Sequence, residues 1–125
     1  MKRIVTGDSL KFVDDGGKEI AELEEQKKEK DVWLIRLKGS ISNDCAYDAA
    51  DELFALISVG NGIILDMADT AYISDTFSER LVQLQIEMEG TEFESMPIQN
   101  MPQAIYRSLK ELGRIASLDY ELKEE

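Results

Sequence analysis

Two short segments near the start of the chain, 10–13 and 19–23, alternate apolar and polar residues or nearly do so. Residues 14–17, Asp-Asp-Gly-Gly, lie between them and are typical of a tight turn, so we predict a β-hairpin. The next run, 24–31, mixes acidic and basic side chains, and we interpret it as a solvated hairpin turn. Residues 32–37 are rich in β-forming side chains and predict a strong strand.

Helical spacing of apolar residues begins after Gly39, which we expect to stop that strand. Residues 45–57 place their apolar side chains on one stripe of a helix, and the Ser-Asn-Asp run at 42–44 offers N-caps for it. The Gly-Asn-Gly run at 60–62 ends the pattern. We therefore predict an amphipathic helix between these two signals.

Two further helices are predicted downstream. Thr76 and Glu79 have the spacing of a capping box, and apolar residues on one face carry this helix to Gly90. The last helix starts at 100–102, where proline is tolerated in the first turn, and its apolar face runs through 105–116.

Short strands separate these helices. The continuous apolar run 63–65 predicts a central strand buried on both faces, followed by a loop over 69–75. Residues 93–98 predict a short strand, and because Pro97 lacks a donor N–H we place it at a sheet edge or strand end. A last short strand is predicted over 118–122.

The order of these elements defines the fold class. Alternating strands and helices predict an α/β domain with a mixed, mostly parallel sheet of four to five strands, antiparallel where the N-terminal hairpin joins. Ligands and partners of such sheets usually meet the loops beyond the carboxyl ends of the strands. Those loops are predicted at 39–43, 67–75 and 99–101.

Composition narrows the classes of function. The 125 residues include 26 acidic and 14 basic side chains, giving a net charge of -12, and there is no histidine. Because the stretch 39–79 has no lysine or arginine, it cannot neutralise phosphates, and nucleic acid is not expected as a partner. The absence of histidine excludes a Ser-His-Asp triad and a histidine-ligated zinc.

The remaining composition points to the cytoplasm. The single Cys45 cannot form an internal disulfide, which suits a reducing compartment, and its place on an apolar helical face predicts a small core residue. The longest apolar runs are far shorter than the roughly 20 residues that a membrane helix needs. We expect a cytoplasmic protein with no membrane segment and no cofactor.

Several segments of the chain resemble a known family. The run 63–76 is similar to the segment that defines STAS domains, which include bacterial anti-sigma factor antagonists: an apolar strand, Leu-Asp, a short loop, an aromatic and aliphatic pair, then Asp-Ser-Ser-Gly opening a helix. The Leu-Asp pair at 65–66 and the Tyr-Ile pair at 72–73 fit this pattern. The segments 37–41, 100–102 and 109–113 also agree.

The resemblance runs in order from about residue 19 to residue 122. It implies a single STAS-like domain over 1–125, with 1–18 as an added N-terminal strand or hairpin. It also implies a bacterial, cytoplasmic, non-enzymatic regulator of transcription. In that family the first serine of Asp-Ser-Ser-Gly is phosphorylated by an anti-sigma factor that is itself a serine kinase. The unmodified antagonist binds this kinase and frees the sigma factor, and phosphorylation breaks the complex.

The chain departs from the family at this serine, and two alignments are open. Without a gap, Ser74 stands at the family aspartate, Asp75 at the phosphorylated serine and Thr76 at the next serine. A loop longer by one residue instead makes Asp75 the family aspartate and Thr76 the phosphoacceptor. The number of residues up to Pro102 favours the ungapped version.

Either alignment puts an anion at a helix N-terminus, where free N–H groups and the helix dipole favour negative charge. A phosphate there carries about -1.5 to -2 and an aspartate about -1, so Asp75 is a weaker, permanent imitation of the phosphorylated state. In the simpler interpretation, Asp75 and Thr76 only cap the helix.

We predict that a partner, an anti-sigma factor of the serine kinase type, contacts the two loops that carry these residues. The expected contact residues are Gly39, Ser40, Ser42, Asp66, Asp69, Tyr72, Ser74, Asp75, Thr76, Phe77 and Ser78. The alternative within the fold is a scaffold or oligomer subunit without phosphorylation, with the last helix and the Pro97 edge as candidates for a homodimer contact.

A rival hypothesis from another class is an aspartyl-phosphate receiver or a carboxylate-metal domain. Asp66, Asp69 and Asp75 are its candidate ligands, because hard cations take carboxylate oxygens. A receiver also needs an acidic pair after its first strand and a lysine after its last. The segments 39–43 and 99–101 supply neither, so we expect no metal site.

Overall fold

A single seven-stranded sheet runs through the computed structural model, which describes residues 1–124. Its strands are β1 (Lys2–Thr6), β2 (Ser9–Val13), β3 (Glu19–Glu29), β4 (Val32–Ile41), β5 (Gly62–Ile73), β6 (Ile98–Met101) and β7 (Tyr120–Leu122). The helices are α1 (Asn43–Ser58), α2 (Asp75–Glu89), α3 (Gln103–Glu111) and the short 3-10 turn η1 (Ile115–Ser117).

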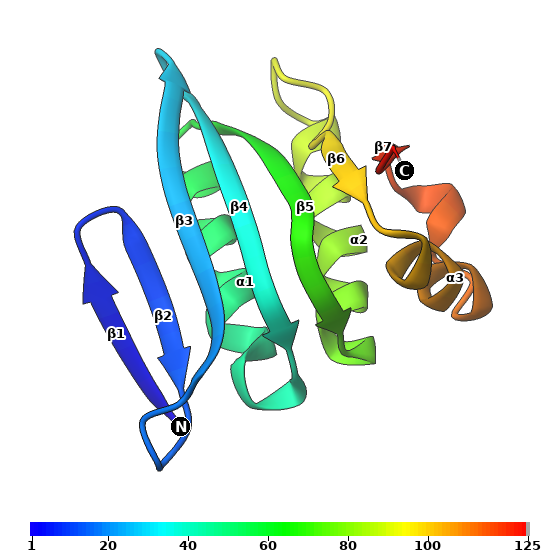
Figure 1. Ribbon diagram of the computed structural model, residues 1–125. Coiled ribbons are helices and arrows are strands. Elements are labelled where there is room, and N and C mark those ends of the chain that lie inside the picture. Colours follow the sequence, from blue (N-terminus) through cyan, green and yellow to red (C-terminus); the bar gives the residue numbers. More distant parts are fainter. Residues whose placement is uncertain (125) are drawn as a thin grey trace.

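The strands lie side by side in the order of the sequence, so the two ends of the chain lie at opposite edges of the sheet (Figure 1). The pairs from β1 to β4 are antiparallel, and those from β4 to β7 are parallel. The α/β class is therefore confirmed. Seven strands replace the predicted four to five, and only half of the strand pairs are parallel.

The first two strands form the hairpin β1–β2, which extends the antiparallel edge of the sheet. The guanidinium of Arg3 lies 3.3 Å from the Glu52 carboxylate of α1 and ties the hairpin to that helix. Asp14 Oδ1 accepts hydrogen bonds from the backbone N–H groups of Gly16 and Lys18, which fixes the predicted turn between β2 and β3.

A pair of carboxyl groups lies beneath this hairpin. Burial, the hydrogen-bonded carboxyl of Glu52 and the nearby charges of Glu52 and Asp8 raise the pKa of Glu25 to about 7. The backbone of Glu25 is also fixed, because its N–H donates to the Asp8 carbonyl at 2.7 Å. A proton held by Glu25 therefore stabilises the junction of β3, α1 and the hairpin.

The charged run 24–31 is strand for most of its length, so its interpretation as a turn is wrong. Residues of β3 pair with β4 as far as Glu29 opposite Val32, and the reversal takes place at Lys30 and Asp31. The charged side chains suit a strand here because successive residues point to opposite faces, and both faces are open to solvent at this end of β3, where residues 26–29 are exposed. The ammonium of Lys27, for example, lies 6.0 Å from the centre of the Trp33 ring.

Gly39 does not stop β4, which continues to Ile41. Its φ is 82°, and a Cβ built on it would overlap the Ile20 carbonyl oxygen beside it. Glycine therefore lets β3 and β4 approach closely instead of ending the strand, next to a bulge in the pairing of β4 with β5.

The predicted loop over 69–75 is also wrong, because β5 runs through to Ile73 beside the extended β4. Thr70 is buried within this stretch, and its hydroxyl donates to the Leu37 carbonyl at 2.8 Å. Ile41 and Ile73 are paired at the ends of the two strands. Pairing with β4 thus stabilises as a strand a segment that is too polar for the sequence pattern to predict one.

Helices α1 and α2 cover one face of the sheet (Figure 1). Apolar residues from the strands and these helices fill the layer between them, including Leu23, Ile35, Leu37, Leu53, Leu65, Met67, Leu81 and Leu84. Cys45 belongs to this core, as predicted, and burial raises the pKa of its thiol. On the other face, Lys38 and Arg36 contact Glu24 at 2.8 and 3.5 Å.

The C-terminal part follows the predicted order with shifted boundaries. Strand β6 begins at Ile98, so the predicted strand over 93–98 is wrong except at its last residue. It lies between β5 and β7 instead of at an edge, whereas Pro97 does stand at a strand end, and its carbonyl accepts a hydrogen bond from Leu65 N–H at 2.8 Å. Helix α3 starts at Gln103, later than the predicted 100–102, and Pro102 is its N-cap residue. It ends at Glu111, so Ala116 is exposed instead of continuing the apolar face. Within residues 1–124, no helix is both long and apolar enough to span a membrane.

Candidate partner-binding site

The first turn of α2 is built on Ser74, the N-cap residue. Its hydroxyl oxygen accepts a hydrogen bond from the Phe77 N–H at 3.2 Å, and its own N–H donates to the Ile41 carbonyl at 2.9 Å. The predicted capping box at Thr76 is therefore wrong, because the cap lies two residues earlier. The second hydrogen bond fixes the start of α2 to the end of β4.

Asp75 is the first residue of α2 and carries the anion expected at this helix end. Its carboxylate is 66% exposed and lies 2.6 Å from the guanidinium Nη2 of Arg114, which follows α3. The Arg114 side chain is only 25% exposed, so it approaches the helix from the protein side and leaves the carboxylate facing solvent. This ion pair, between residues 39 positions apart in the sequence, thus joins the segment that follows α3 to the start of α2.

The neighbouring hydroxyl groups differ in accessibility. Ser74 and Ser78 are buried, and the Ser78 hydroxyl donates to the Asp75 carbonyl at 2.6 Å. Thr76 is half-buried, so of these three residues it is the one a kinase would reach most readily. Phe77 is fully buried and acts as a core residue, not as a contact residue.

The end of β4 lies beside this turn, as predicted. Ser40 is paired with Tyr72 in the sheet, and Ser42 is the N-cap residue of α1. Tyr72 is 52% exposed, whereas Ser40 and Ser42 are half-buried. The structure therefore brings Ser40, Ser42, Tyr72 and Asp75 to one end of the sheet.

Asp66 does not belong to this cluster, and Asp69 precedes it on β5, opposite Lys38 of β4. Asp66 lies eight residues before Ser74 along β5, which corresponds to about 25 Å of strand. Its Oδ1 accepts from Asn100 Nδ2 at 3.2 Å and from the Ala68 N–H at 3.0 Å, so it links β5 to β6. In the described part of the chain, no three acidic or cysteine side chains are grouped so that they could hold a metal ion.

No pattern in the sequence indicates Arg114 as part of this site. It follows Gly113 with no other basic residue beside it, and only the folded chain brings it to Asp75. The outer surface of α1 and α2, with Tyr47 and Arg80, is equally absent from the sequence prediction. Tyr47 and Arg80 are 33 positions apart in the sequence, and only the packing of α1 beside α2 brings them into contact.

This architecture, an extended sheet with two helices on one face and a third helix near the last strands, defines the STAS fold that the sequence resemblance predicts. A solved structure with this fold is that of the anti-sigma factor antagonist SpoIIAA in its unphosphorylated form. It matches this chain with a TM-score of 0.62 and 13% sequence identity, covering 82% of this chain and 89% of SpoIIAA. The likeness at this identity concerns the fold. A scan against protein-family models finds no match, and a search of curated proteins finds no significantly similar sequence.

Proposed function

We propose that this chain is a non-enzymatic regulatory domain that binds a partner protein of the anti-sigma factor type through the start of α2 and the adjoining end of β4. The likeness of its fold to SpoIIAA, an anti-sigma factor antagonist, supports this class of function. The position of Asp75 carries the proposal, because this solvent-facing carboxylate opens α2 beside Tyr72 and Ser42.

In the ungapped alignment, Asp75 stands where the family carries its phosphorylated serine. A carboxylate at this position is a fixed negative charge, smaller than a phosphate, on a helix end that favours anions. Arg114 partly neutralises this charge at 2.6 Å. We infer that the negative charge, which the family adds and removes as a phosphate, is permanent here. The amount of complex would then depend on the concentrations of the two proteins and not on phosphorylation.

The test begins with a pull-down from the host organism and identification of the captured partner. The affinity of that partner for the wild-type chain and for Asp75→Ser is then measured by calorimetry. Serine restores the uncharged side chain that the family presents before phosphorylation, so we expect Kd to fall by about threefold or more. The control is Asp15→Ser, the same change at an exposed carboxylate in the hairpin turn, which should leave Kd unaltered.

Two results would contradict the proposal. An equal Kd for wild type and Asp75→Ser would mean that this turn is not the contact. A mass spectrum showing phosphate on Ser74, Thr76 or Ser78, after incubation with a captured kinase and ATP, would replace a constant charge by a switch. Phosphate on Thr76 would favour the shifted alignment, consistent with the greater accessibility of this hydroxyl.

A further inference from the structure

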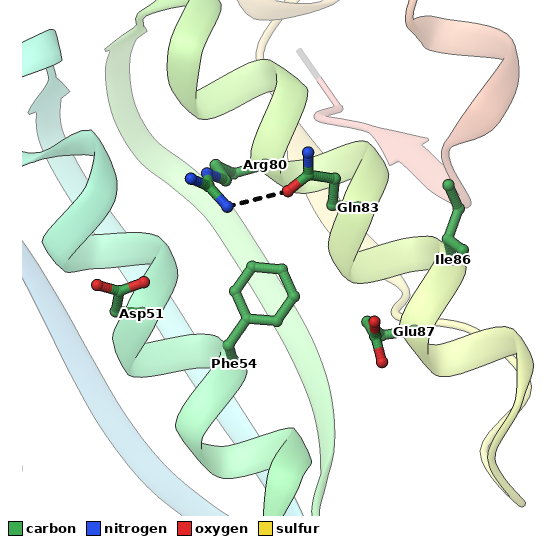
Figure 2. A pocket seen from close by; sticks show the side chains of 6 residues that line it. All are labelled: Asp51, Phe54, Arg80, Gln83, Ile86 and Glu87. Carbon is green, nitrogen blue, oxygen red and sulfur yellow. Dashed lines mark hydrogen bonds between the residues drawn. The ribbon is translucent and has the colours of Figure 1, made fainter.

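A groove of about 440 Å³ lies between α1 and α2 on the side of the helices away from the sheet (Figure 2). Six residues line it: Asp51, Phe54, Arg80, Gln83, Ile86 and Glu87. Phe54 reaches from α1 toward α2 and forms the apolar centre of the groove (Figure 2). This surface is distinct from the start of α2, so its role is independent of the proposed function.

Apolar side chains are unusually exposed along this groove. Ile86 is 59% exposed on α2, and Tyr47 is 55% exposed on α1. The Arg80 guanidinium lies 4.8 Å from the centre of the Tyr47 ring, which extends the surface toward the N-terminal ends of both helices. Apolar residues gathered between polar rims mark sites of interaction more often than single exposed residues do.

The charge around the groove is mainly negative. Helices α1 and α2 together carry eight carboxylates and a single basic residue, Arg80. Arg80 is already engaged, because it also donates to Gln83 Oε1 at 3.1 Å. The carboxylates of Asp51 and Glu87 stand on opposite walls. Such a surface attracts a cationic partner and repels the same face of a second copy of this chain.

The shape of the groove indicates the form of the partner. Both walls are helices whose backbone groups are bonded internally, so no free strand edge is present within the groove for an extended peptide to join. Both helices lead back from the carboxyl ends of the parallel strands β4 and β5, so they run in the same direction. A third helix can pack its side chains between two such helices without leaving backbone groups unsatisfied.

We propose that the groove between α1 and α2 binds an amphipathic helix of a partner protein, with an apolar row against Phe54 and Ile86 and flanking lysine or arginine residues against Asp51 and Glu87. The apolar row supplies most of the affinity, and the basic flanks supply selectivity and a dependence on salt.

The probe is a fluorescein-labelled peptide of about 14 residues, about four helical turns, with leucine at helical spacing and lysine elsewhere. Fluorescence anisotropy is expected to show saturable binding that weakens as salt is raised. The comparison peptide has the same leucines and lysines in an order without an amphipathic face, and it should bind about tenfold more weakly.

Two variants separate apolar docking from general attraction between opposite charges. Ile86→Glu removes an apolar anchor while making the groove more acidic, and we expect it to raise Kd about tenfold. Val59→Glu makes the same change in charge at a residue that is 75% exposed and lies outside the groove, and it should leave Kd within about twofold. Both positions are exposed, and equal unfolding temperatures will show that the fold is retained.

Three results would overturn the proposal. The two variants could bind the peptide equally well, which would mean that charge alone drives binding. The reordered peptide could bind as tightly as the amphipathic one, which would exclude a helical face. Sedimentation could also show that the wild-type chain is a dimer which Ile86→Glu dissociates, in which case a second copy occupies the groove.

Discussion

At the scale of the residue, the two serines that precede α1 and α2 have different roles. Ser74 caps α2 with a side-chain hydrogen bond to Phe77 N–H, whereas Ser42 occupies the N-cap position of α1 without such a bond. The presence of a serine at the N-cap position therefore does not by itself decide how much that residue contributes to the stability of the helix. The deciding factor is whether the hydroxyl oxygen meets a free N–H group.

This contrast predicts unequal effects of one substitution. Ser74→Ala should lower the free energy of unfolding by about 1 kcal/mol or slightly more, because a buried N–H loses its acceptor. Ser42→Ala is the matched control and should change it by less than about 0.5 kcal/mol. Urea denaturation followed by circular dichroism measures both. Equal losses in the two variants would show that the Ser74 cap bond is not a specific contribution.

Glycine positions differ in a similar way. Gly39 combines a φ of 82° with a backbone oxygen in the space that an added Cβ would need, while Gly60 has a φ of 93° and open space around it. Gly60→Ala should cost about 1 kcal/mol from backbone strain alone. Gly39→Ala should cost at least about 2 kcal/mol more, because β3 and β4 must also separate. Similar unfolding midpoints for the two variants would contradict the close approach of β3 and β4.

At the scale of the element, the strands explain which parts of the fold can be predicted. The helices are predictable because their apolar residues recur at a fixed period and face one neighbour, the sheet. The lengths of β3, β4 and β5 are not, since polar residues such as Lys27 and Asp69 suit a strand only when the adjacent strand is present. The candidate site shares this limit: Tyr72 and Asp75 are identified locally, while Arg114 reaches Asp75 only through the tertiary fold.

The junction of β3 with α1 predicts a dependence of stability on pH. The pKa of Glu25 is raised from 4.5 to about 7, so the folded state keeps a proton that the unfolded state loses over this range. The contribution of Glu25 to stability is therefore full below pH 4.5 and falls as pH rises toward 7. With solvent screening of this half-exposed pair, the loss is about 1 kcal/mol.

Chemical denaturation at several pH values tests this junction. Glu25→Gln should abolish the fall in stability, because an amide does not ionise. The neighbouring Glu24→Gln should keep the fall, since the hydrogen bond from Lys38 lowers the pKa of Glu24. A fall of equal size in Glu25→Gln and wild type would assign the pH dependence to other groups.

At the scale of the whole molecule, charge is divided between the layers. Helices α1 and α2 carry eight carboxylates against one basic residue, while the open face of the sheet pairs Glu24 with Arg36 and Lys38. Self-repulsion is therefore concentrated in one layer, where Asp48 stands one helical turn from both Asp44 and Glu52.

This distribution predicts that salt stabilises the protein. Raising NaCl from about 10 to about 150 mM shortens the screening length from about 30 to about 8 Å, which weakens repulsion within the helical layer. We expect Tm to rise by about 2–4 °C, a change of less than about 1 kcal/mol. Asp48→Asn should show a smaller rise, because it removes two like-charge pairs from α1. A Tm that falls with salt would indicate that the ion pairs of the open face dominate instead.

The hydrogen bond from Ser74 N–H to the Ile41 carbonyl has a consequence for observing the molecule at work. It joins Ile41, the last residue of β4, to Ser74, the N-cap residue of α2. The first turns of α1 and α2 can therefore separate only if this hydrogen bond breaks. The rate at which the Ser74 amide hydrogen exchanges with deuterium therefore reports how often the ends of β4 and β5 separate. A partner that holds the two strand ends together will slow this exchange, and a partner that separates them will accelerate it.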